Sequence, residues 1–189
     1  DGRAQGFDKV GEALDLSSVH LQRTMDAARQ ALNAAMNKGD APEKLDKTIA
    51  FDAGRNATHI GKSWHKLEDG SVVTFNDAGY PALMAEFEAS VAGLYRVTLS
   101  GRSYQSDKPV MVTIFTGPFG AGTPTRFQSV QEFFPAGNEV QIEVQLKVRD
   151  KIRLFPELKT FDYNLNQKNG PAKYPGPGLA MKPMHVEGP

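Results

Sequence analysis

The apolar residues of the first part of the chain recur with the period of an α-helix. Two good N-cap residues, Ser17 and Ser18, precede a run in which apolar positions are spaced by four and three residues in turn. The apolar positions are Leu21, Met25, Ala28, Leu32 and Ala35. Gly39 stands where a C-cap belongs, and Pro42 opposes continuation of the helix. The pattern predicts a helix from about residue 18 to about residue 38.

From about residue 50 onward the pattern changes to the alternation that is typical of antiparallel strands. In the run 94–99, Tyr95, Val97 and Leu99 share one face, and in the run 140–146 four aliphatic residues alternate with three polar ones. Turn signals rich in Gly, Pro, Asn and Asp separate such runs. The candidate strands are 72–76, 83–89, 93–104, 109–116, 126–134, 140–148, 151–155 and 179–187. Roughly eight short strands at this spacing predict a mainly β fold, an antiparallel β-sandwich with an N-terminal helical extension.

The chain is therefore expected to have two parts, a helical extension with a linker over residues 1–48 and a β-sandwich domain over residues 49–189. The linker is charged and becomes apolar at residues 49–51, so it either remains a connector or leads into a first strand. Residues 160–178 show no periodicity and are rich in Asn, Gly and Pro, which predicts a long irregular loop. Such a loop is often functional, and the simpler interpretation is a surface excursion before the last strand.

Composition excludes several classes of protein. The 22 basic and 22 acidic residues balance, which argues against nucleic acid as a partner. The chain has no cysteine, which rules out disulfides, thiolate metal sites, cysteine nucleophiles and covalently attached c-type haem within it. No apolar run is long enough for a membrane span. The chain starts at Asp1 without a leader, and we expect it to be an excised piece or a processed product.

Signals of catalysis and of metal binding are weak. No nucleophile, phosphate-binding or metalloprotease motif occurs, so we expect no enzyme. A polysaccharide hydrolase would need two carboxylates across a cleft, and no motif marks such a pair. His59 and His65 are close enough in sequence to share a metal, but no third ligand follows at a recognisable spacing. The sequence leaves open a structural calcium, to which Glu86, Glu88 and Asp150 could contribute, and predicts no other cofactor.

Aromatic residues near amides and carboxylates give the strongest functional signal. Trp64 is the only tryptophan and lies in a polar run outside any strand pattern, while Tyr163 lies in the irregular stretch. Exposed rings stack on the C–H faces of sugars, and amide or carboxylate groups bond sugar hydroxyls. The predicted ligand-binding residues are Trp64, Tyr104, Gln105, Asp107, Tyr163 and Asn164. The simpler interpretation of a lone tryptophan is a core residue.

Five phenylalanines fit the interiors of the predicted strands and are assigned to the core. They are Phe75, Phe87, Phe115, Phe127 and Phe155.

Several short runs resemble a known family. The opening run GFDKVGEALDLS at residues 6–17, followed by the helix, resembles the end of a helical domain in large planctomycetal multi-domain c-type cytochromes. The runs GLYRV at 93–97, YQSDKPV at 104–110 and YPGPGLA at 174–180, and the ending VEGP at 186–189, resemble the β-domain that follows it. The resemblance covers most of the chain. The haem-binding motif of these cytochromes is missing here, so no electron-transfer role and no catalytic residue is carried over.

The resemblance implies a jelly-roll β-domain similar to carbohydrate-binding modules of exported proteins, and hence a periplasmic, cell-surface or secreted location. Our first hypothesis is a noncatalytic carbohydrate-binding module of a larger exported cytochrome-like protein. Its partner would be a polysaccharide or oligosaccharide, bound by aromatic stacking and hydrogen bonds. The alternative is a structural or docking domain that spaces or orients neighbouring haem domains of the same polypeptide, or binds a protein partner.

Overall fold

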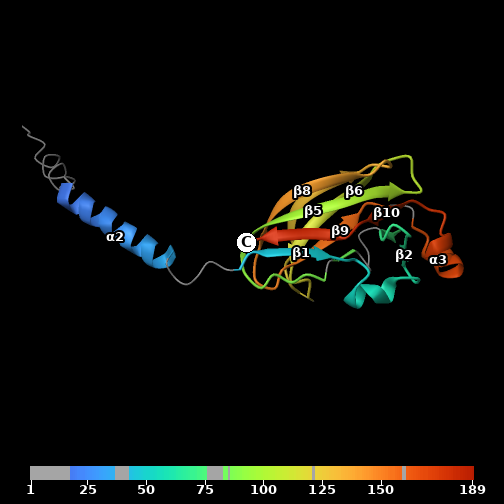
Figure 1. Ribbon diagram of the computed structural model, residues 1–189, viewed down its shortest axis with the longest axis horizontal. Coiled ribbons are helices and arrows are strands. Elements are labelled where there is room, and N and C mark those ends of the chain that lie inside the picture. The colour runs from blue at the N-terminus through green and yellow to red at the C-terminus, as the bar shows by residue number, and fades with distance from the viewer. Residues whose placement is uncertain (1–17, 37–42, 76–82, 85, 121, 159–160) are drawn as a thin grey trace, which may run out of the picture. The chain divides into compact units, whose positions relative to one another are not determined.

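A computed structural model describes residues 18–36, 43–75, 83–84, 86–120, 122–158 and 161–189. The chain forms two compact units, Asp1–Ala41 and Pro42–Pro189, and each is described by itself. Helix α2 (Ser18–Met36) belongs to the first unit, and the strands that the structure describes belong to the second (Figure 1). None of the described helices combines the length and the hydrophobicity that crossing a membrane requires.

Helix α2 (Ser18–Met36) forms the described part of the first unit. It begins where the sequence predicted, because alanine-rich segments favour helix and the preceding polar residues favour a helix start. Leu21, Met25 and Leu32 are exposed on this helix. The predicted capping residues after the helix lie outside the described residues.

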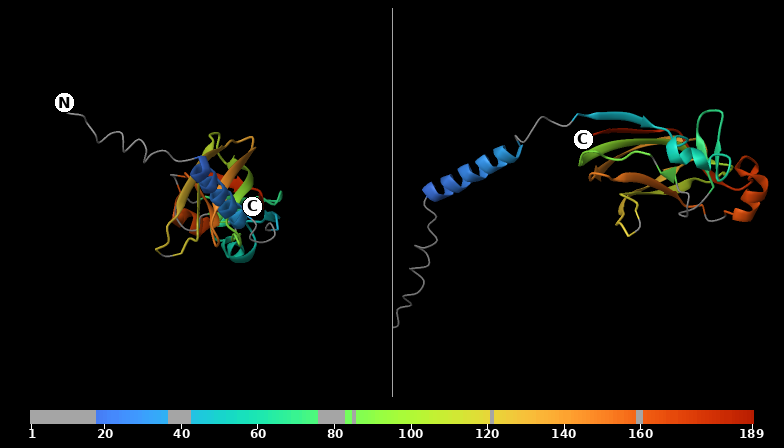
Figure 2. Two further views of the ribbon diagram at one scale, coloured as in Figure 1. Left: turned by 90° about the vertical axis from the view of Figure 1, so that its left-hand side faces the viewer. Right: turned by 90° about the horizontal axis from the view of Figure 1, so that it is seen from below.

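Two sheets of antiparallel strands make up the second unit (Figures 1 and 2). The larger sheet contains β1 (Leu45–Ile49), β2 (Trp64–Lys66), β3 (Val72–Thr74), β5 (Gly93–Tyr104), β8 (Asn138–Leu146), β10 (Gly178–Met181) and β11 (Met184–Gly188). The smaller sheet contains β4 (Leu83–Met84), β6 (Val110–Gly117), β7 (Arg126–Phe133) and β9 (Lys151–Pro156). The short helices of this unit are η1 (Gly54–His59), α3 (Tyr163–Asn169) and η2 (Pro171–Lys173).

Side chains from both sheets share one hydrophobic core. Tyr95, Val97 and Leu99 alternate inward along β5 as predicted, and all three are buried. They belong to the same cluster as Ile114 of β6 and Leu154 of β9 in the other sheet. Two sheets that bury their inner faces against each other form a β-sandwich, so the predicted fold is confirmed.

Strand β5 organises the larger sheet. It pairs with β8 on one side, and on the other side with β11 near its beginning and β10 near its end. The prediction of one continuous strand over residues 179–187 is wrong, because the chain breaks between β10 and β11. Pro183 lies in the break and has no N–H to donate to the ladder. The Lys182 N–H still donates to the Ser100 carbonyl over 2.9 Å, so both pieces stay beside β5.

The β-domain was expected to start at residue 49. The larger sheet already begins at Leu45, because β1 pairs with β11 from that residue onward. Strand β1 lies at the edge of the sheet, and Asp46, Lys47 and Thr48 are all exposed. The structure therefore decides between the two open interpretations in favour of a first strand, which carries no alternating pattern because only Ile49 is buried.

The stretch predicted as a long irregular loop contains helices α3 and η2, so that prediction is wrong for residues 163–173. The Asp162 carboxylate caps α3 by accepting from the Leu165 N–H over 3.0 Å, and Gly170 ends it with φ of +75°. A helix of seven residues is too short to show periodicity. Leu165 and Tyr174 belong to a second, smaller core on the other face of the larger sheet.

The assignment of five phenylalanines to the core is confirmed for two of them and wrong for the other three. Phe75 and Phe87 are buried, whereas Phe127 is 59% exposed. Phe115 and Phe155 are half-buried, and Phe115 contacts the rings of Phe127 and Phe155 edge-on at 6.1 and 5.3 Å. Phe115 and Phe155 alternate with core residues along their strands, and Phe127 contacts Phe115, so the three rings lie on the outer face of the smaller sheet.

Candidate functional site

A hollow of about 490 Å³ lies between the segment that follows η1 and helix α3. Both segments are at the end of the sandwich opposite the C-terminus (Figure 1). They meet because β2 pairs with β3, β3 pairs with β10, and η2 contacts β2. The lining residues are His59, Gly61, Lys62, Ser63, Tyr163, Asn166, Gln167 and Gly170.

Helix α3 presents an aromatic ring and two amides to this hollow. Tyr163, Asn166 and Gln167 are three and four residues apart, a spacing that places side chains on one face of a helix. The side chain of Tyr163 is 63% exposed, so its ring is available to a ligand. An aromatic face beside amide groups provides both an apolar surface and hydrogen bonds.

Asn166 connects helix α3 to the segment that follows η1, on the other side of the hollow. It is buried, and its Nδ2 donates to the Lys62 carbonyl over 3.1 Å. Its Oδ1 has no hydrogen-bond partner within the part of the chain that the structure describes. Buried polar atoms are usually satisfied, so this amide oxygen is an exception, and it belongs to a residue that lines the hollow.

The prediction that the Trp64 ring contacts a ligand is wrong, because the side chain is wholly buried. Pairing of β2 with β3 directs the indole into the sandwich core, where it belongs to the main hydrophobic cluster. The His59 ring lies against it, with ring centroids 4.9 Å apart. An indole has a large apolar surface, and its burial stabilises the fold more than exposure would.

His59 gives the hollow a neutral hydrogen-bonding group. Burial lowers the pKa of His59 below its ordinary value of 6.5, and the positive charge of Lys62 acts in the same direction. At neutral pH the imidazole is therefore uncharged and offers one donor and one acceptor. The hollow thus combines a neutral imidazole, a lysine cation and amides.

Tyr104 and Gln105 hold the structure together and do not line the hollow. The Tyr104 ring packs edge-on against Phe75 with centroids 6.0 Å apart. Gln105 has φ of +52°, and its amide nitrogen, in the orientation that satisfies its neighbours, donates to the carbonyls of Tyr174 and Gly176 over 2.9 Å each. These contacts fix the segment between η2 and β10, which is a structural role.

Of the six predicted ligand-binding residues, one lines the hollow, namely Tyr163. Asn164 is exposed on the same helix without lining it, and Asp107 is exposed in the turn after β5. The residues that sequence reasoning missed are His59, Lys62, Asn166 and Gln167. The capping Asp162 ahead of the run YNLNQ was the signal that could have placed the last two on a helix with Tyr163.

The weak sequence signal for a metal shared by His59 and His65 gains no third ligand from the described residues. In the described ranges, neither His59 nor His65 belongs to a group of three metal-ligating side chains. The group that does form consists of Asp46, His185 and Glu187, which sequence reasoning did not identify.

Two of the side chains considered for calcium are engaged with cations of the protein. Asp150 is buried and accepts from the Arg126 guanidinium. Glu88 lies 3.6 Å from the Lys151 ammonium. These carboxylates therefore have structural partners on the smaller sheet.

Comparison with known proteins gives matches to different parts of the chain. A family model described as "PSD3: Protein of unknown function (DUF1587)" matches residues 1–37. No curated protein matches the sequence. Among solved structures, the chain is similar to the CBM22-1 xylan-binding domain of Paenibacillus barcinonensis Xyn10C, with 7% identity and a TM-score of 0.39 over 77% of this chain and 81% of that chain.

Two further solved structures are similar to this chain. One is a mutant of CBM29-2, a family 29 carbohydrate binding module, with 9% identity and a TM-score of 0.41 over 77% of this chain and 86% of that chain. The other contains the CBM22-1 and GH10 modules of Clostridium thermocellum xylanase Xyn10B complexed with xylohexaose. It has 6% identity and a TM-score of 0.39 over 77% of this chain and 25% of that chain.

Proposed function

We propose that the β-sandwich binds a carbohydrate, without cleaving it, in the hollow beside helix α3. The observation that carries this proposal is the exposed ring of Tyr163 at the edge of a hollow lined by Asn166 and Gln167. A sugar ring would stack its C–H face on the tyrosine, and its hydroxyls would bond the amides. The volume of about 490 Å³ is in the usual range for small-ligand sites.

The charges around the hollow indicate the class of saccharide. Its described lining contains the Lys62 cation and a neutral His59, and it contains no carboxylate. A neutral or acidic saccharide suits this lining better than a basic one. Glycoside hydrolysis needs two carboxyl groups that face the sugar, so the proposal for this hollow is binding.

Affinity electrophoresis and calorimetry with a panel of neutral and acidic polysaccharides test the proposal. Tyr163→Ala should weaken binding about fivefold, because a ring contact of this kind contributes on the order of 1 kcal/mol. Phe127→Ala is the matched control, since it removes another exposed ring from the other sheet and should leave affinity unchanged. Absence of binding to every polysaccharide, or equal loss in both variants, would contradict the proposal.

A second candidate is a docking role within a larger exported, cytochrome-like polypeptide. It is supported by helix α2, where Leu21, Met25 and Leu32 are exposed. An apolar helix face of this kind commonly packs against another domain. Changing Leu21 and Leu32 to Glu should weaken association with the remainder of the polypeptide while glycan binding stays the same. Unchanged association would argue against docking through this face.

A further inference from the structure

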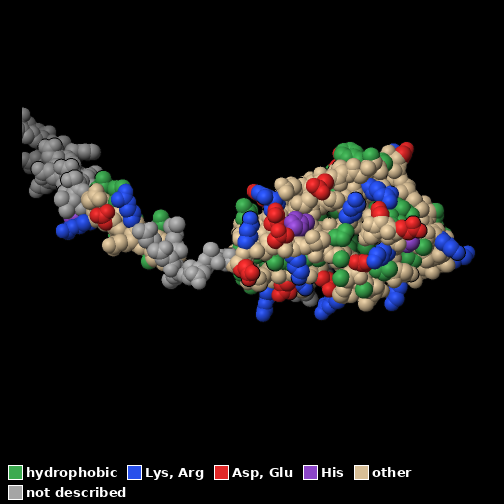
Figure 3. Space-filling view, in the orientation of Figure 1, with side chains coloured by type: hydrophobic (Ala, Val, Ile, Leu, Met, Phe, Trp, Pro, Cys, Tyr) green, Lys and Arg blue, Asp and Glu red, His purple; other side chains and the backbone are tan. Residues whose placement is uncertain are grey.

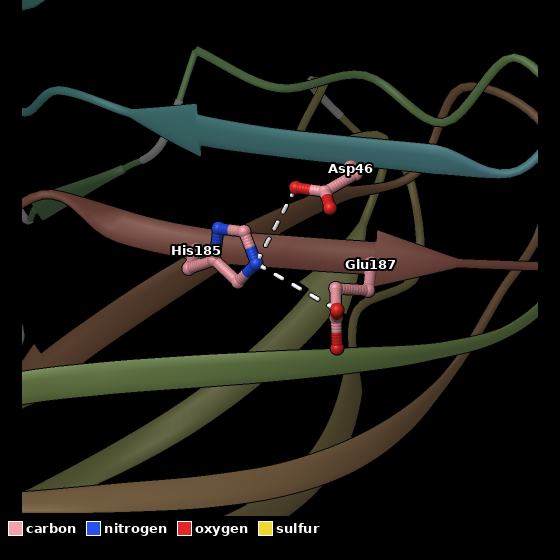
Figure 4. A group of neighbouring side chains, drawn as sticks. All are labelled: Asp46, His185 and Glu187. Atoms are coloured by element: carbon pink, nitrogen blue, oxygen red, sulfur yellow. Dashed lines mark ion pairs between the residues drawn. The ribbon is translucent and has the colours of Figure 1, made fainter.

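A histidine and two carboxylates meet on the outer face of the larger sheet, at the end where the C-terminus lies (Figures 3 and 4). His185 Nε2 lies 3.5 Å from Asp46 Oδ1 and 3.9 Å from Glu187 Oε1. One ligand atom from each residue lies within 4.8 Å of the other two. Figure 4 shows the imidazole nitrogen directed between the two carboxylates.

The pairing of β1 with β11 produces this arrangement. Asp46 lies directly opposite Glu187 in the antiparallel register, and His185 is two residues before Glu187 on the same strand. Side chains two residues apart in a strand share a face, and directly opposed residues lie beside each other. The three groups are therefore held by backbone hydrogen bonds of the sheet, and they are half-buried or exposed, so an ion can reach them.

We propose that Asp46, His185 and Glu187 form a binding site for a divalent transition-metal ion of the zinc class. Imidazole nitrogen and carboxylate oxygen bind Zn²⁺ at about 2.0–2.2 Å, so tetrahedral ligand atoms are about 3.3 Å apart. The His185 to Asp46 distance is close to that value, and Glu187 needs only a small side-chain rotation. Three protein ligands leave one position for water, whereas Ca²⁺ prefers an all-oxygen set.

The surroundings of His185 favour metal binding through Nε2 of its ring. The Thr48 hydroxyl lies 3.4 Å from His185 Nδ1, which leaves Nε2 free to face the carboxylates. Metal-binding histidines commonly donate their other ring N–H to such an acceptor. Arg96 Nη1 lies 3.6 Å from Glu187 Oε2, whereas His185 Nε2 faces the other oxygen, Glu187 Oε1. One carboxylate oxygen of Glu187 therefore remains on the side of the histidine for an ion.

Zinc titration of the whole chain tests the site. Calorimetry with Zn²⁺ should show one saturable site, and Co²⁺ should give a visible absorption band with the same stoichiometry. His185→Gln and Asp46→Asn should each weaken Zn²⁺ binding at least tenfold, and Thr48→Val should weaken it about tenfold. His65→Gln is the matched control, since it removes another half-buried histidine and should leave the affinity unchanged.

Two further measurements separate a built site from surface adsorption. Zn²⁺ should raise the melting temperature of the wild-type chain and of His65→Gln but not of His185→Gln, because the ion joins β1 to β11. An excess of Ca²⁺ should not displace Zn²⁺. No saturable binding, or equal losses in His185→Gln and His65→Gln, would show an adventitious metal only and overturn the proposal.

Discussion

The imidazole of His59 lies against the indole of Trp64, with ring centroids 4.9 Å apart and planes inclined by 49°. Trp64 is wholly buried in the sandwich core, whereas His59 lines the hollow beside helix α3. The wall of the hollow is therefore built directly on the core. Any change that disturbs the indole should alter the hollow as well as the stability of the fold.

Replacing Trp64 with Ala should lower the free energy of unfolding by about 3–5 kcal/mol, since it removes a large buried ring and leaves a cavity. Urea denaturation followed by circular dichroism measures this loss. Phe127→Ala removes an exposed ring and should cost less than about 1 kcal/mol. Comparable losses in the two variants would mean that Trp64 is not part of the core.

The lowered pKa of His59 makes stability depend on pH. Burial favours the neutral ring in the folded state, whereas the unfolded chain takes up a proton near the ordinary value of 6.5. Between the unfolded and folded pKa values the unfolded state binds more protons. Stability is therefore fully present above about pH 6.5, and part of it is lost as the pH falls through this window.

His59→Gln should remove this part of the pH dependence, as measured by urea denaturation at about pH 7.5 and about pH 5.5. His65→Gln serves as the control. If His59→Gln and the wild type lose equal stability between these two pH values, the imidazole is not desolvated.

Two carboxylates affect stability only at more acidic pH. Hydrogen bonds from Lys66 and Ser71 lower the pKa values of Asp52 and Asp69 below 3.8, so their stabilising effect is lost only as the pH falls below that value.

The ion pair between Arg126 and Asp150 should be important for the smaller sheet. Asp150 is only 2% exposed, and it accepts from the Arg126 guanidinium and the Lys147 N–H. Arg126→Met should cost about 3 kcal/mol, because it leaves a buried carboxylate without its cation. Adding Asp150→Asn should recover part of that loss in thermal unfolding, since the amide is uncharged. A further loss in the double variant would argue that the charge of Arg126 is not what matters.

The N-cap of helix α3 should stabilise the helix that lines the hollow. Asp162→Ala removes the acceptor for the Leu165 N–H and should cost about 1 kcal/mol. Hydrogen exchange should become faster at the Leu165 amide and its neighbours in α3. Asp162→Asn keeps a good cap and should resemble the wild type. If exchange is unchanged in Asp162→Ala, the helix start does not depend on this side chain.

Long elements with a clear period were predicted from sequence, whereas the first strand was left open and the short helix α3 was missed. Strand β5 has the predicted bounds because Tyr95, Val97 and Leu99 alternate with polar residues over a long run. Strand β1 gave no clear signal because it is an edge strand with one buried residue, so the sequence left it open. Helix α3 was missed because its seven residues span two helical turns. Local patterns report burial only when enough residues share a face.

The candidate sites depended on contacts between distant residues. The sequence indicated Tyr163 as a binding residue, but the hollow also needs Lys62 and Asn166, which meet through the packing of α3 against the end of the sheet. Asp46 and His185 come together only through the register of β1 and β11. Contacts between residues so far apart in sequence cannot be predicted from local spacing.

An N-terminal helix, a set of alternating strands that bury one face, and the lack of cysteine chemistry follow directly from the order of residues along the chain. The burial of Trp64, the exposure of Tyr163 and the meeting of His185 with two carboxylates do not follow from it and depend on how the elements pack. Periodicity specifies which face of an element is apolar. Burial and neighbours are decided by which elements then pack together.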